Sequence, residues 1–382
     1  MSLPVPLSIS AFVPIWTGRT NLVDDSIADR ATGYDHEIRA LGGMWEAKIS
    51  FTATVDEINE WILNGVGRHI EVYDAGGVVF EGAVNEIDAS VGSLSLKRGP
   101  LLGVANKVSN QYTTTGYATT PPIPGSPATY GPVENTTSQG LYGIIPYIID
   151  GGTVTATEAE RDVRDYLREN AFPKLTRDIS GGGGGVSLTL NVLGYIHWLK
   201  TEVYEQTAST GTQNLSAKLQ AVLAAEANAI FSTDYTRITS NTTAVRQYEN
   251  KQYTGWGLVK DMVKKSDVSN NRYTFGCYAG RKVRYETAPT SIEYHYAVTG
   301  EEQRVTTPSG QIVEPWRLRP GKWVLLEDAM QGSIMPVSSL REDLRTFFLE
   351  SVTYSALFGF DLKEGNADDI GAAVNKELGI GV

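Results

Sequence analysis

Short alternating runs of apolar and polar residues near the start of the chain constrain the fold most strongly. Apolar residues alternate with polar ones between residues 72 and 84, on either side of the segment Asp74–Gly77. A glycine-containing turn between two alternating runs is typical of a β-hairpin. Similar runs at 49–55 and 93–97 predict further strands, and the pattern at 56–64 predicts a short helix between them. A meander of twisted strands with one helix favours a small barrel over residues 1–110.

The middle of the chain has a different character. Residues 111–140 are rich in Tyr, Thr, Gly and Pro without periodicity, which predicts an extended loop that reaches out to a neighbouring subunit. A helix is expected at 156–170, capped by Thr155 or Thr157, and the apolar spacing predicts others at 193–205, 215–231 and 256–265.

Alternation returns from Asn271, and a last strand is expected at 347–354. The fold class is therefore α+β, mainly β, with two β-barrel domains and a helical and loop insertion between them. The predicted parts are an N-terminal barrel, an extended loop, a helical insertion, a C-terminal barrel and a tail, at 1–110, 111–155, 156–268, 269–363 and 364–382.

The charge of the chain limits its partners. The 382 residues include 33 Lys and Arg against 44 Asp and Glu, a formal net charge of -11. Residues 1–150 carry most of this imbalance, with 8 basic and 16 acidic side chains. Such a chain is poorly suited to bind nucleic acid, because nonspecific binding needs cationic side chains that neutralise phosphates. No segment is long and apolar enough to span a membrane, so a soluble protein is expected.

No pattern in the chain predicts catalysis. The single cysteine, Cys277, excludes an internal disulfide and any multi-cysteine metal site. No Gly-x-Ser-x-Gly elbow occurs, and the glycine run at 181–185 lacks the Lys-Ser/Thr ending of a phosphate loop, so it predicts a flexible connector. We therefore expect no enzyme, and we assign no catalytic, cofactor-binding or metal-binding residue. The four histidines, none at ligand spacing, are His36, His69, His197 and His295.

Acidic pairs and aromatic clusters leave open the alternative of a protein that binds or cleaves glycans. The pairs Asp24–Asp25 and Glu301–Glu302 are most simply solvated surface, although a carboxylate pair of a glycosidase has the same residue types. The cluster Tyr294–His295–Tyr296 fits a sugar-stacking platform, cross-strand pairs in a sheet, or anchors of an interface.

Several sequence segments together resemble the baseplate or tail hub proteins of tailed bacteriophages, of the siphophage tail-tip type. Those similar to the N-terminal barrel of that family are Gly42–Trp45, Gly65–Ile70 and Val72–Gly82. Those similar to its later parts are Thr137–Gly143, Glu158–Asp162, Trp256–Asp267, Gly280–Tyr285 and Pro315–Trp323. The resemblance implies two tube-like barrels per chain. It carries over no functional residue, and the glycine run at 181–185 has no place in it.

The resemblance implies a structural virion protein that forms a homo-oligomeric ring, typically a trimer, between the tail tube and the tail tip. Its expected location is the phage tail, assembled in the host cytoplasm. Its expected partners are tail-tube, distal-tail and tail-tip or fibre proteins, with DNA passing through the channel without specific binding. We expect part of the excess acid in residues 1–150 to face this channel, because an acidic wall repels DNA within about 8 Å.

Three other functions fit the sequence. The first is a distal tail protein, which has a related barrel and forms a hexameric ring. The second is a glycan-binding or glycan-cleaving protein of the tail tip. The third is an ordinary binding protein of a bacterial host whose likeness to the family is accidental.

Overall fold

A single large sheet dominates the computed structural model. The structure describes residues 6–17, 23–26, 30–116, 125–179, 185–201, 203–204, 213–245, 253–265, 267, 269, 271, 273–299, 302–327 and 339–365. The sheet has 16 strands, and the main hydrogen-bonded path runs in the order β2 (Val23–Ser26), β1 (Ser8–Phe12), β5 (His69–Asp74), β6 (Gly77–Val91), β12 (Val186–Leu193), β4 (Leu41–Phe51), β3 (Ala31–Arg39), β22 (Thr346–Ser355), β21 (Trp323–Leu326), β19 (Ile292–Thr299) and β20 (Glu302–Thr306).

Five further strands attach to this path. They are β7 (Leu94–Arg98), β11 (Leu175–Ile179), β17 (Tyr273–Tyr278), β18 (Lys282–Thr287) and β23 (Gly359–Glu364). The chain is therefore mainly β with helices, as the sequence predicts. Within the described residues no pairing joins β2 to β20, so the path stays open at both ends.

The predicted hairpin is confirmed. β5 and β6 pair antiparallel with Asp74 opposite Gly77, and β7 follows as the third strand. The predicted helix is α1 (Val55–Asn64), which begins with a capping box in which Thr54 and Glu57 bond to each other's backbone N–H. Its apolar side chains Ile58, Trp61 and Ile62 are buried against the sheet. Such burial, about 25 cal/mol per Å² of apolar surface, stabilises the helix far more than its propensity does.

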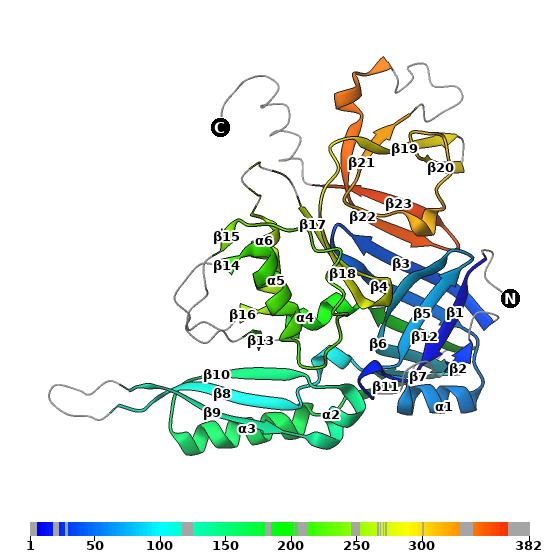
Figure 1. Ribbon diagram of the computed structural model, residues 1–382. Coiled ribbons are helices and arrows are strands. Elements are labelled where there is room, and N and C mark those ends of the chain that lie inside the picture. Colours follow the sequence, from blue (N-terminus) through cyan, green and yellow to red (C-terminus); the bar gives the residue numbers. More distant parts are fainter. Residues whose placement is uncertain are drawn as a thin grey trace.

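Strands from the N-terminal and C-terminal parts of the chain pair with each other in this sheet. β22 pairs antiparallel with β3, and β17 pairs parallel with β4 over Leu41–Gly43. These contacts join the predicted N-terminal and C-terminal β domains through continuous backbone hydrogen bonds, with β3 and β22 side by side (Figure 1).

The prediction of an extended loop over 111–155 is wrong for the described residues. They form β8 (Lys107–Thr114), β9 (Pro127–Glu134), α2 (Thr136–Tyr142) and β10 (Pro146–Val154). Their pairing is non-local, with β10 parallel to β8, and tertiary pairing of this kind overrides a sequence that lacks periodicity. Residues 117–124 lie outside the description. Figure 1 shows the three strands as an arm beside the main sheet.

A helix covers this arm. α3 (Ala156–Asn170) confirms the helix expected at 156–170, and Thr155 is its cap, with a capping box to Glu158. Its residue Val163 packs with Ala105 and Val108 in a small core separate from the main one.

The predicted helical insertion contains a central strand of the main sheet. β12 is bonded to β6 on one side and to β4 on the other, and Leu188, Leu190 and Val192 are buried. Apolar and polar residues alternate over 188–193, but the preceding glycine run indicated a connector and not a strand. Of that run, only Gly185 is among the described residues. The remaining elements are α4 (Trp198–Thr201), α5 (Leu215–Ala224), α6 (Gly255–Val263), the two-residue strands β13 (Val203–Tyr204), β14 (Gln213–Asn214), β15 (Ala244–Val245) and β16 (Tyr253–Thr254), and the 3₁₀ turns η1 (Ile15–Thr17), η3 (Leu101–Gly103), η4 (Tyr195–His197), η5 (Ala279–Arg281), η6 (Pro315–Arg317) and η8 (Glu342–Leu344).

The helices expected at 215–231 and 256–265 are confirmed as α5 and α6, although α5 ends at Ala224. The helix expected at 193–205 is shorter, because η4 and α4 occupy only 195–201. No helix in the described part of the chain is long and apolar enough to cross a membrane.

Candidate functional site

One side of the main sheet is an open polar surface, which we call the polar face. On eight neighbouring strands, from β11 through β7, β6, β12, β4, β3 and β22 to β23, inward apolar residues alternate with outward polar ones. The outward side chains include Asp35, Glu37, Arg39, Glu46, Lys48, Ser50, Glu86, Asp88, Ser90, Ser95, Lys97, Thr176, Asp178, Ser187, Thr189, Asn191, Thr353, Asp361 and Lys363, all half-buried or exposed. Strand pairing places them in rows, such as Glu86, Asn191, Lys48 and Asp35 across four strands.

The polar face has more carboxylates than cations. Two of its cations are engaged by its own acids: Lys97 Nζ lies 2.6 Å from Glu86 and 3.9 Å from Asp88, and Arg39 lies 2.7 Å from Glu37. The hydrogen bond that Lys97 donates to Glu86 raises the pKa of the Lys97 ammonium. The net field over this face is therefore negative, and it extends into solvent over about a Debye length.

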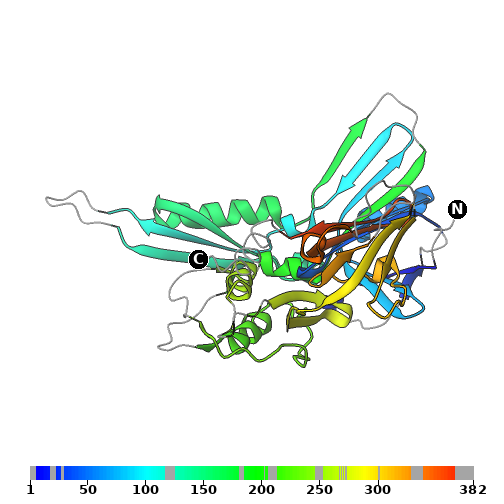
Figure 2. The ribbon, with the colours of Figure 1, turned by 90° about the horizontal axis from the view of Figure 1, so that it is seen from above.

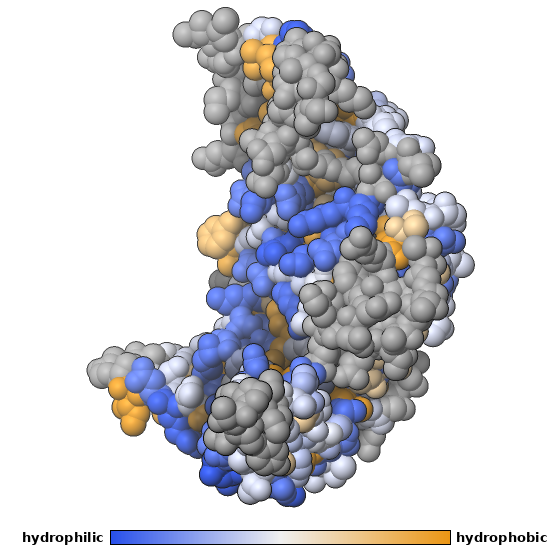
Figure 3. All heavy atoms as spheres, turned by 90° about the vertical axis from the view of Figure 1, so that its left-hand side faces the viewer, coloured by the Kyte–Doolittle hydropathy of each residue, from blue (hydrophilic) through white to orange (hydrophobic). Residues whose placement is uncertain are grey.

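A shallow groove of about 340 Å³ opens on the polar face. Asp35, Glu37, Glu46, Lys48 and Asn191 are among its lining residues. Hydrophilic residues also predominate along the concave outline of the molecule in Figure 3. A broad, hollowed and acidic sheet surface of this kind suits contact with water and mobile ions, and it repels polyanions.

At one end the sheet projects from the body. The strands β11, β7, β6 and β12 stand out together in Figure 2. On the side opposite the polar face their ends carry four aliphatic residues in register, Ile179, Leu94, Val91 and Val186. Ile179 is 79% exposed and Val186 is 39% exposed. We call these four residues the apolar row. Exposed aliphatic side chains that lie next to one another form a candidate contact surface for another protein.

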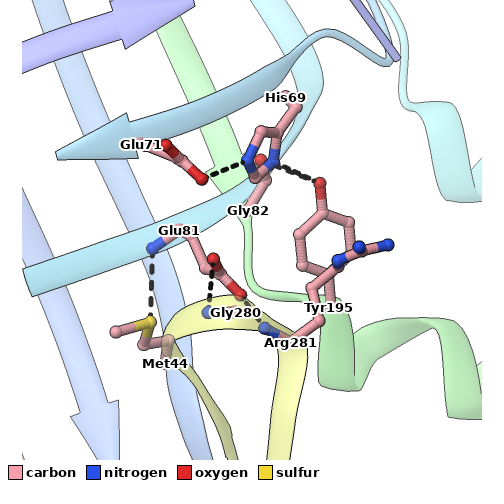
Figure 4. A network of polar contacts seen from close by, with 8 residues as sticks. All are labelled: Met44, His69, Glu71, Glu81, Gly82, Tyr195, Gly280 and Arg281. Atoms are coloured by element: carbon pink, nitrogen blue, oxygen red, sulfur yellow. Dashed lines mark hydrogen bonds and ion pairs between the residues drawn. The ribbon is translucent and has the colours of Figure 1, made fainter. Parts of the chain in front are cut away.

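A buried polar cluster lies where the sheet meets the helical region. His69 on β5 contacts Tyr195 of η4 through Nδ1, 2.6 Å from the hydroxyl, and contacts Glu71 through Nε2 at 2.9 Å. Glu81 on β6 accepts hydrogen bonds from the backbone N–H groups of Gly280 at 3.0 Å and Arg281 at 2.5 Å. Figure 4 shows these side chains converging from both strands and both turns. Burial raises the pKa of the Glu81 carboxyl, and the neighbouring His69 and the two N–H groups partly oppose this.

Three of the histidines occupy other environments. Burial lowers the pKa of His36 to about 3. The same effect, with the positive charges of Lys200 and Arg39, lowers the pKa of His197 to about 3. His295 is half-buried and contacts Glu327 at 2.6 Å.

Sequence reasoning missed the group His69, Glu71 and Glu81. Within the described part of the chain it is the one set of three His, Cys, Asp or Glu side chains with donor atoms close enough to hold a metal ion. The predicted turn at Asp74–Gly77 would by itself place Glu71 opposite Phe80. A β-bulge between Val72 and Tyr73 shifts the register by one residue, so that Glu71 faces Glu81.

The other residues singled out from the sequence form no site. Cys277 is 2% exposed on β17, and burial raises the pKa of its thiol well above the ordinary value. Tyr294 is buried at 7% exposure, and Tyr296 packs edge-on against Phe360, so these rings stabilise the sheet and form no exposed platform. The side chains of Asp24–Asp25 and Glu301–Glu302 lie outside the described part.

Comparison with known proteins gives similarity in structure only. No protein-family model matches the chain, and no curated protein matches it. Among solved structures, the chain is similar to the tail protein from Neisseria meningitidis MC58, with 8% identity and a TM-score of 0.42 over 95% of this chain and 97% of that one. It is also similar to the 43 kDa tail protein of prophage MuSo2 from Shewanella oneidensis, with 8% identity and a TM-score of 0.41 over 96% of this chain and 98% of that one.

Proposed function

We propose that this chain is a structural, non-enzymatic protein of a phage tail, a hub subunit whose copies form a ring around the DNA channel. The observation that carries the proposal is the polar face. It spans eight strands from distant parts of the chain, it is open, and its acidic side chains outnumber its basic ones. A surface built in this way suits the wall of a channel.

The charge of this wall matters because of the charge of DNA. Duplex DNA carries one negative charge per ~1.7 Å of its axis, and a cationic wall would hold it by counterion release. The acids Asp35, Glu37, Glu46, Glu86 and Asp88 all belong to the acidic first 150 residues and lie on the polar face. This supports the expectation that the excess acid of that region faces the channel.

The ring contact is assigned to the projecting sheet. The apolar row would be covered by a second copy, and β11 has a backbone edge with which a neighbouring strand can pair. Each chain contributes two β regions joined through β3 and β22, so three chains would supply six such regions to a tube with sixfold symmetry. The tail-tube, distal-tail and tail-tip proteins are its proposed neighbours in the virion.

Replacing Ile179 with aspartate is expected to prevent ring assembly. The substitution places a charge in the apolar row, where burial against a neighbour would be costly. Native mass spectrometry and electron microscopy of the purified full-length chain should show trimeric rings for the wild type and monomers for I179D. The matched control is I312D, since Ile312 is 62% exposed and lies outside the row.

Rings of I179D as stable as those of the wild type would contradict the role of the apolar row. A wild type that stays monomeric at tens of micromolar, alone and with its tail partners, would contradict the hub. A wild-type ring of six subunits would favour the distal tail protein.

Neutralising acids of the polar face is expected to slow DNA ejection. Virions assembled with D35N/E46Q would repel DNA less strongly than wild-type virions, because the channel wall loses two negative charges. Ejection can be followed by fluorescence of a DNA-binding dye after addition of the receptor. The control is E169Q, which removes an exposed carboxylate from α3. An unchanged ejection rate in D35N/E46Q would show that the polar face lies away from the DNA.

A further inference from the structure

We propose that His69, Glu71 and Glu81 bind one divalent transition-metal ion, with Zn²⁺ as the best match. The three side chains offer one imidazole nitrogen and two carboxylate oxygens, and these donor atoms all lie within 4.8 Å of one another. Imidazole favours transition metals over Mg²⁺ and Ca²⁺, and Zn²⁺ accepts both donor types. The proposal is independent of the proposed ring.

Strand pairing brings these side chains to one place. Glu71 and Glu81 are direct partners on β5 and β6, and His69 lies two residues before Glu71, on the same face. Like charges directly opposite one another destabilise a pair of strands. A cation between the two carboxylates would convert this repulsion into attraction, and the imidazole completes a three-ligand set.

The surrounding groups orient the donors as they do in metal sites. Metal-bound histidines usually bond through their other ring nitrogen to a second group, and ligating carboxylates are themselves hydrogen-bonded. Here Tyr195 holds His69 Nδ1 at 2.6 Å, which directs Nε2 toward Glu71. The backbone N–H groups of Gly280 and Arg281 hold Glu81, as Figure 4 shows. Each carboxylate oxygen has a second lone pair that can face an ion.

The backbone at η5 places two consecutive residues in the left-handed region. Gly280 has φ 74°, which glycine adopts freely, and Arg281 has φ 57°, which is strained for an arginine. The result is a pair of adjacent N–H groups that point at the Glu81 carboxylate. Strained backbone of this kind is concentrated at functional sites.

Burial gives the site a dry interior and one solvent-facing side. Glu81 is 3% exposed and His69 is 8% exposed, while the side chain of Glu71 keeps 20% of its exposure. Zinc ligands lie ~2.0–2.2 Å from the ion, so the glutamate side chains would rotate to bring their oxygens around it. The bound ion would connect β5 and β6 to η4 and η5, where the helical region contacts the sheet.

Metal binding to the full-length protein tests the proposal. Chelator-treated protein is dialysed against Zn²⁺, and bound metal is measured by mass spectrometry, with Co²⁺ as a spectroscopic substitute. We expect one ion per chain, Co²⁺ absorption bands of a nitrogen and oxygen site, and a melting temperature several degrees higher with Zn²⁺ than without. H69Q and E71Q should each weaken binding at least tenfold, and Y195F by about tenfold through the orientation of His69.

The control variant is H295Q, which removes the other half-buried contact between a histidine and a glutamate, to Glu327. It should bind metal as the wild type does. Absence of a stoichiometric ion in the wild type, or undiminished binding in E71Q, would overturn the site. E71Q is decisive even if H69Q fails to fold, because Glu71 is partly exposed and its variant can be checked for native circular dichroism.

Discussion

Gly43→Ala is expected to separate β17 from β4 and to lower the free energy of unfolding by roughly 3 kcal/mol or more. Gly43 has φ 74°, and a Cβ there would lie 2.6 Å from the backbone nitrogen of Cys277. A Cβ on Gly276 would in turn lie 2.5 Å from the Cα of Gly43. The two glycines therefore permit a backbone approach that no other residue type allows.

The matched control is Gly92→Ala. Gly92 also has a positive φ, of 60°, but nothing lies within 4 Å of the position its Cβ would take. This variant should cost only about 1 kcal/mol, the strain of a left-handed alanine. Urea unfolding followed by tryptophan fluorescence measures both. If G43A and G92A unfold at the same urea concentration, the close pairing of β4 and β17 is not present in solution.

Asp74→Asn is expected to destabilise the protein by about 2–4 kcal/mol. Asp74 lies at the turn between β5 and β6, and its carboxylate accepts hydrogen bonds from Trp316 Nε1 at 2.8 Å and Arg317 Nε at 2.6 Å, on η6. A second Arg317 nitrogen makes the contact bidentate. The side chain of Asp74 is only 8% exposed. Asparagine keeps one acceptor oxygen and no charge, so the variant loses part of the hydrogen bonding and the counter-charge of Arg317.

The same contact predicts how stability depends on pH. Burial opposes ionisation of Asp74, but the hydrogen bonds from Arg317, Trp316 and Gly76 outweigh it and lower the pKa of the carboxyl. The folded state therefore binds its proton at lower pH than the unfolded state. The stability from Asp74 is fully present above the unfolded value, near pH 4, and is lost as the pH falls through the folded value.

Thermal melts between pH 2 and pH 7 measure this effect. The difference in melting temperature between wild type and D74N should be largest at neutral pH and shrink toward pH 2. D343N is the control, because Asp343 pairs with the exposed Arg341 two residues away and links no distant segments. A difference that stays constant with pH would show that the ion pair with Arg317 does not stabilise the fold.

Local patterns were sufficient for much of the fold. The alternation around Asp74–Gly77 predicted β5, β6 and the turn between them, whereas their register beyond the turn depends on the β-bulge between Val72 and Tyr73. The helix α1 followed from apolar spacing, and α3 followed from apolar spacing and its threonine cap. These elements depend on contacts between residues close in sequence, which a single chain reveals directly.

The arm and β12 could not be predicted in the same way. The parallel pairing of β8 with β10 and the position of β12 between β4 and β6 depend on partners far away in sequence. Strand propensity is weak compared with such pairing, so a Thr- and Gly-rich stretch became a sheet and an apolar run inside a helical region became a central strand.

For the candidate sites, sequence and structure contributed different parts. The sequence by itself determined that the chain is acidic, that its first 150 residues carry most of the charge, and that it has no internal disulfide. The tertiary structure decided where the charge lies, because only strand pairing sorts outward residues from inward ones over eight strands. It also brought His69 and Glu71 to Glu81, Tyr195 and η5. A buried polar cluster is stable only when hydrogen bonds from distant segments offset the free-energy cost of removing its groups from water.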